Sequence, residues 1–82
     1  MARRSFSIDI SEDPNTLVDR ARRLAAQNNA LLEGDTSSGR FSGRGIEGIY
    51  DIEGTTVTVT ITDKPFFLPW EYVESRVREF FR

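Results

Sequence analysis

The strongest constraint on the fold lies in residues 45–62, GIEGIYDIEGTTVTVTIT, where apolar and polar side chains alternate with a period of two. That period is typical of half-buried strands, and Glu53-Gly54 interrupts it with a turn signal. The segment therefore predicts a β-hairpin with one buried face, made of Ile46, Gly48, Tyr50 and Ile52 on the first strand and Val57, Val59 and Ile61 on the second. A glycine in mid-strand, Gly48, further predicts a bulge or the close approach of a helix.

A strand and a helix are expected before this hairpin. Residues 5–10 also alternate, which predicts a strand. Asp13 is suited to cap a helix, and Pro14 suits the first helical position because its missing N–H would be unpaired there. The apolar stripe that follows consists of Leu17, Val18, Ala21, Leu24 and Ala25. Asn28-Asn29 fits the end of the helix, since asparagine tolerates a left-handed backbone.

The remaining segments carry weaker signals. Leu31-Leu32 suggests a short strand that ends at a turn, Gly34-Asp35, and the glycine- and serine-rich residues 36–45 suggest a weak, edge-like strand at Arg40–Ser42. Pro69 opens a last helix whose apolar face is Trp70, Val73, Val77, Phe80 and Phe81.

Together these elements predict a two-layer α+β fold in the order β-α-β-β-β-β-α, with an antiparallel sheet and both helices on one face. A chain of 82 residues is expected to form a single domain over residues 1–82.

Composition narrows the function. The chain has no histidine and no cysteine, which removes the usual general base, the usual metal ligands and a thiol nucleophile. We therefore expect no enzyme activity, no cofactor and no metal. A net charge of -2 does not favour nucleic acid, and the sequence contains neither an export signal nor an apolar run that spans a membrane. The expected location is the cytoplasm. The ratio of ten arginines to one lysine is typical of GC-rich bacterial genomes.

The first candidate site is the apolar corner Phe66, Phe67, Leu68 and Trp70, which is bracketed by two prolines. If exposed, it would mark a surface for a partner, a polymer or a second subunit. We expect most of these side chains instead to close the end of the sheet beneath the last helix, because so small a core needs them. Phe67 and Trp70 are the two that we expect to be shared with a neighbouring subunit.

Three charged clusters are weaker candidates. Residues 39–45, with Arg40 and Arg44 among glycines, match no phosphate-loop spacing. Glu47, Asp51 and Glu53 share one strand face and are expected to be solvated, paired across the sheet with Arg40 or Arg44. Arginines 20, 22 and 23 are expected on the solvent face of the first helix.

An ordered series of motifs resembles a small bacterial family, the polyhydroxyalkanoic acid system proteins. The series is Glu33-Gly-Asp35, Phe41 and Gly43, residues 45–48, residues 57–61, residues 65–69 and a terminal helix that ends in aromatics. The resemblance covers about half of the chain and implies a short α+β protein from the setting of storage-polyester genes, with no catalytic residues to assign. A weaker likeness is to helix-grip lipid-binding domains, although this chain has too few strands for their usual cavity.

From this we expect a non-enzymatic accessory or binding protein. It would form a homo-oligomer, or bind a protein or a hydrophobic granule, through the apolar corner and the C-terminal helix. The alternative is a small carrier that holds an acyl chain between sheet and helices, with Tyr50 and Tyr72 as candidate ligand contacts.

Overall fold

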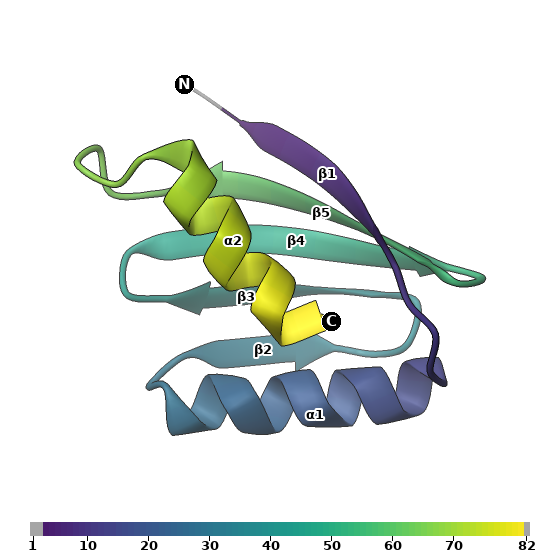
Figure 1. The fold of residues 1–82 in the computed structure, drawn as a ribbon. Helices are drawn as coiled ribbons and strands as arrows, with labels where there is room; N and C mark the ends of the chain where they lie inside the picture. Colours follow the sequence, from purple (N-terminus) through teal and green to yellow (C-terminus); the bar gives the residue numbers. More distant parts are fainter. Residues whose placement is uncertain (1–2, 82) are drawn as a thin grey trace.

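The computed structural model describes residues 3–81, which form a five-stranded antiparallel sheet and two helices (Figure 1). In chain order the elements are β1 (Arg4–Asp9), α1 (Pro14–Gln27), β2 (Leu31–Gly34), β3 (Ser38–Gly43), β4 (Ile46–Glu53), β5 (Thr56–Asp63) and α2 (Trp70–Phe81). The predicted α+β class and the order β-α-β-β-β-β-α are both confirmed.

The strand order in the sheet is β1-β5-β4-β3-β2. Strands β2 to β5 therefore form a meander of consecutive hairpins, and β1 adds to the far side of β5. After β1 the chain crosses to the opposite edge, where α1 runs alongside β2 (Figure 1).

Both helices pack on one face of the sheet, as predicted. This core contains Ile8, Ile10, Leu17, Val18, Ala21, Ala25, Leu32, Tyr50, Val57, Val59, Ile61, Val73, Val77 and Phe81. Figure 1 shows α2 lying diagonally over the sheet, so that it approaches α1 at its C-terminal end and diverges from it toward its N-terminal end.

Both ends of α1 lie where the sequence predicts them. The carboxylate of Asp13 accepts a hydrogen bond from the backbone N–H of Asn15 at 2.7 Å, and Pro14 is the first helical residue. Asn28 is the C-cap, and Asn29 has a left-handed φ of 58°. The turn after β4 is one residue later than predicted, at Gly54-Thr55, and α2 begins at Trp70 rather than at Pro69.

β3 is an interior strand and not the edge-like strand that we predicted, because β2 pairs with it on the side away from β4. Two aromatic rings cover glycines across the β3–β4 pair. Tyr50 on β4 lies opposite Gly39, and Phe41 lies opposite Gly48. A Cβ at either glycine would collide with the ring across from it. Each ring thus supplies the packing that its glycine lacks.

The contact between Phe41 and Gly48 lies where the pairing of β4 is irregular. A register shift between β4 and β5 confirms the predicted bulge at Glu47/Gly48. The group that approaches Gly48 is the ring of Phe41 rather than a helix. The ring of Phe81 then packs against both aromatics, 5.5 Å from Tyr50 and 6.1 Å from Phe41, so these strands also seat the end of α2.

Candidate binding site at the diverging ends of the helices

An aromatic turn, Pro65–Leu68, connects β5 to α2. The backbone N–H of Leu68 donates to the carbonyl of Pro65 at 3.2 Å, which places Phe66 and Phe67 at the two central positions of a tight turn. Their side chains are 94% and 70% exposed, and the rings meet edge to face at 5.7 Å. The prediction that most of the corner is buried is wrong for Phe66, because the central positions of a turn project away from the elements that it joins. Phe67 is exposed for the same reason, and its contact with a neighbouring subunit stays a prediction.

The other two residues of the corner are partly buried against the core, Leu68 at the end of the turn and Trp70 at the start of α2. The indole of Trp70 has cations nearby, the guanidinium of Arg4 at 5.8 Å and the ammonium of Lys64 at 5.2 Å from the ring centre. Lys64 also donates hydrogen bonds to the carbonyls of Pro65 and Leu68, at 3.2 Å and 2.6 Å. The only lysine of the chain thus holds the aromatic turn in shape.

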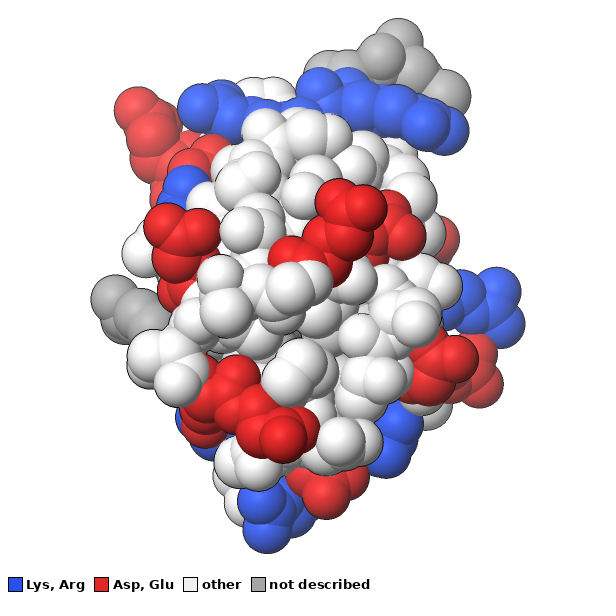
Figure 2. Space-filling model, turned by 90° about the vertical axis from the view of Figure 1, so that its right-hand side faces the viewer, with Lys and Arg blue, Asp and Glu red and all other residues white. Residues whose placement is uncertain are grey.

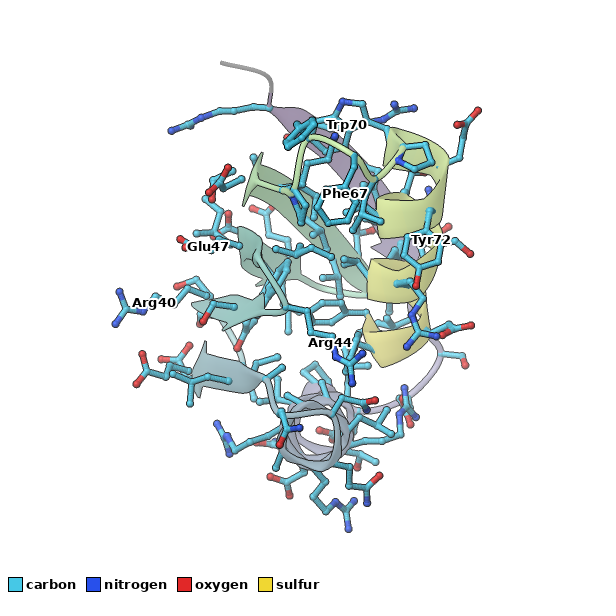
Figure 3. All side chains as sticks on the ribbon, turned by 90° about the vertical axis from the view of Figure 1, so that its left-hand side faces the viewer. Arg40, Arg44, Glu47, Phe67, Trp70 and Tyr72 are labelled. Carbon is cyan, nitrogen blue, oxygen red and sulfur yellow. The ribbon has the colours of Figure 1, made fainter. Side chains whose placement is uncertain are left out.

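A cleft of about 250 Å³ opens where the two helices diverge. Its floor comes from β2, β3 and the start of β4, and its walls come from the C-terminal end of α1 and from α2. The apolar residues that line it are Ala25, Ala30, Leu31, Leu32, Phe41, Ile46, Leu68, Val77, Phe80 and Phe81. Figure 3 looks onto this end of the molecule, where Arg44 lies between the two helices, Tyr72 lies on α2 and Phe67 lies farther up, near the start of α2.

Small residues keep the cleft open. Ala25 and Ala30 place only methyl groups on its α1 side, and Gly43 places none. Gly43 is required there, because a Cβ would come within 2.5 Å of the Cβ of Ala30. The helix axes diverge at this end while the side chains between them stay short, so the space is not filled.

The charged residues that line the cleft are both arginines, Arg44 and Arg76. Arg44 lies in the two-residue turn between β3 and β4, and its Nε donates to the carbonyl of Asn28 at 3.4 Å. Arg76 lies on α2 and forms an ion pair with Glu79 at 3.3 Å, in which both side chains are about half exposed. The opposite end of the molecule, by contrast, carries acidic side chains across its centre (Figure 2).

The two tyrosines that we predicted as ligand contacts have different environments. Tyr72 is 49% exposed and lines the cleft. Tyr50 is 1% exposed, and its hydroxyl donates to the carbonyl of Asp35 at 2.8 Å. Burial raises the pKa of Tyr50, the charge of Asp35 raises it further, and Arg22 acts in the opposite direction. Tyr50 is therefore a core residue, and its predicted role as a ligand contact is wrong.

Asp35 organises the loop between β2 and β3. Its carboxylate accepts hydrogen bonds from the backbone N–H groups of Ser37 and Ser38 at 2.8 Å and 3.1 Å. These bonds favour the charged form and lower the pKa of Asp35.

The remaining charged clusters are separated by the fold. Glu47, Asp51 and Glu53 lie exposed on the face of β4 away from the helices, and Arg40 pairs with Glu33 at 2.9 Å rather than with any of them. Within residues 3–81 no three carboxylates gather closely enough to hold a metal ion.

The arginines of α1 are divided in the same way. Arg20 forms an ion pair with Glu12, and Arg22 donates to the carbonyl of Gly34 at 3.0 Å.

Comparison of the chain with family models, with curated proteins and with solved structures finds no match. The resemblance to polyhydroxyalkanoic acid system proteins therefore stays a prediction. Neither of the two helices within residues 3–81 has the length and apolar character needed to cross a membrane.

Proposed function

We propose that this chain is a non-enzymatic binding protein that associates through the aromatic turn and the adjoining face of α2. The observation that carries the proposal is the exposure of Phe66 and Phe67, two large apolar side chains that touch each other at the tip of a turn. Burying one phenylalanine side chain is worth about 1.5–3 kcal/mol. A matching apolar surface would therefore gain several kcal/mol by covering the pair.

The partner that we propose is a second copy of the chain. A core this small leaves much apolar surface to be covered, and oligomerisation is the usual supplement. The resemblance noted above adds a polyester granule as the alternative apolar surface.

Sedimentation velocity over a wide range of protein concentrations tests this proposal. We expect the native chain to associate with increasing concentration, and Phe66→Glu or Phe67→Glu to shift it to a folded monomer whose thermal stability no longer rises with protein concentration. The matched control is Ile49→Glu, which places the same charge at an exposed apolar site on the other face of the sheet. A native chain that stays monomeric at every concentration would refute self-association. Dissociation caused by Ile49→Glu but by neither phenylalanine variant would refute the aromatic turn as the interface.

A second candidate function, the carrier of a small apolar ligand, is favoured by the cleft between α1 and α2. Tyr72 remains the proposed polar contact at its α2 side. Native mass spectrometry of the protein purified from cells tests this candidate directly. A bound mass in the range of an acyl chain supports a carrier, and a bare chain that no added fatty acid stabilises excludes it.

A further inference from the structure

We infer that the cleft between α1 and α2 is a binding site for a small amphipathic carboxylate, whose alkyl chain lies on the apolar floor and whose carboxylate meets Arg44. The inference rests on the carrier function proposed above and adds the chemical class of the ligand.

The size of the cleft suits a small ligand. Protein interiors are packed about as densely as organic crystals, so unfilled apolar space is unusual. The cleft holds about 250 Å³, just below the range of about 300–1,000 Å³ that is common for small-molecule sites. It therefore suits a short chain better than a long fatty acid or a folded partner.

Among residues 3–81, the charged side chains around the cleft are all basic. The whole chain has two more acidic than basic residues, yet the described residues that line the cleft include two arginines and no aspartate or glutamate. This composition favours an anionic ligand over a cationic one. The ion pair of Arg76 with Glu79 is half exposed, and such pairs contribute little, so Arg76 can exchange it for a ligand.

Arg44 has an unusual backbone conformation for an arginine. Arg44 and Gly45 have φ values of 54° and 83°, as a type I′ turn requires. Glycine, asparagine and aspartate are the usual residues at such positions, and a non-glycine residue held in this conformation is a strained choice that often marks function. The turn conformation therefore does not favour an arginine at position 44. The reason for an arginine there lies in what its side chain binds.

The side chain of Arg44 has the donors that a carboxylate needs. One of its five N–H groups donates to the carbonyl of Asn28, and within residues 3–81 it forms no ion pair. A guanidinium can hold a carboxylate through two parallel hydrogen bonds, which an ammonium group cannot match. Figure 3 shows this side chain at the gap between the helices, beside the cleft.

Calorimetric titration of the full chain with three eight-carbon probes tests the head group. We expect octanoate to bind, 1-octanol to bind at least tenfold more weakly, and octylamine to bind most weakly of the three. Along the series hexanoate, octanoate and decanoate, affinity should rise up to about fourfold per methylene until the cleft is full.

Two variants locate the carboxylate. Arg44→Asn keeps a residue that suits the turn, so it should retain the fold, lose at least tenfold in affinity for octanoate and leave octanol binding unchanged. Arg40→Asn is the matched control, because Arg40 lies on β3 outside the cleft, and it should leave octanoate binding unchanged.

The outcomes separate the inference from the carrier function. Equal affinity for octanoate and octanol, in the native chain and in Arg44→Asn, would overturn the carboxylate site while leaving an apolar carrier. Absence of binding for all three probes would overturn both.

Discussion

The ring of Tyr50 packs against the backbone of Gly39 directly across the β3–β4 pair, where a Cβ on the glycine would lie 2.5 Å from Cε2 of the ring. The hydroxyl of the same ring reaches the carbonyl of Asp35, in the loop that joins β2 to β3. One side chain thus links the centre of the sheet to the hairpin at its edge. The identity of residue 39 is set by this contact.

Gly39→Ala should destabilise the fold by about 2–3 kcal/mol, because the added methyl group meets both Tyr50 and the backbone carbonyl of Glu33. The comparison is Gly54→Ala, where no atom lies within 4 Å but φ is 60°. Its cost should be about 1 kcal/mol and arise from the backbone alone. Urea unfolding of both variants measures the difference. Equal costs would contradict the steric explanation.

Tyr50→Phe should cost about 1 kcal/mol, the usual net value of one hydrogen bond, because it removes the donor to Asp35 and leaves the ring in place. Tyr72→Phe removes the same hydroxyl from a half-exposed ring and should change stability by less than about 0.5 kcal/mol. Both values come from urea unfolding at neutral pH. If Tyr72→Phe proved the costlier change, the hydroxyl of Tyr50 would not be the one that matters.

The carboxylate of Asp35 should make stability depend on pH under acidic conditions. Its pKa is lowered in the folded state from the ordinary value of 3.8, chiefly by the N–H of Ser37 and then by that of Ser38. The unfolded chain therefore binds the proton first as pH falls. The stabilisation is complete above the unfolded pKa and is lost as pH falls below 3.8 through the folded pKa.

Asp35→Asn provides the reference for this measurement, since its side chain does not titrate. The difference in unfolding free energy between the native chain and Asp35→Asn should be constant from neutral pH down to about pH 5 and should shrink below about pH 4. A difference that did not vary with pH would mean that the bonds to Ser37 and Ser38 do not favour the charged form.

Lys64→Met should destabilise the fold by about 2 kcal/mol, because it removes two charged hydrogen bonds to carbonyls of the aromatic turn. It should also shift the fluorescence of Trp70, the only tryptophan, to longer wavelength as the turn loosens. Arg4→Met is the control, since it removes the other cation near the indole but no bond to the turn. An equal shift in both variants would trace the signal to the cations alone.

The parts of the fold that sequence could predict are those set by neighbours along the chain. The alternation through Val57, Val59 and Ile61 specified a buried strand face, and Asp13-Pro14 specified the start of α1. β3 was only partly foreseen, since propensity alone makes residues 36–45 a poor strand. The sequence does not show which side chains lie opposite these glycines in the sheet, and it is the rings covering Gly39 and Gly48 that stabilise the strand pair.

The candidate site was harder to predict than the fold. The aromatic corner was recognised from its sequence, but the exposure of Phe66 and Phe67 depends on a turn that closes between Pro65 and Leu68. The cleft leaves no local signal in the sequence. It exists because the side chains of Ala25, Ala30 and Gly43 are small or absent and because the two helices diverge. The left-handed backbone of Arg44 was not predictable either, because arginine is not a usual residue at such a turn position.

The position of β1 has a consequence for synthesis. Its partner in the sheet is β5, and Ser5 hydrogen-bonds to Thr60 across 55 positions of the chain. On a ribosome that adds about 5–20 residues per second, β1 therefore waits several seconds before the strand that it pairs with exists. The hairpins from β2 to β5 can form in the order in which they are made, so β1 is made before the other four strands of this sheet and joins it after them.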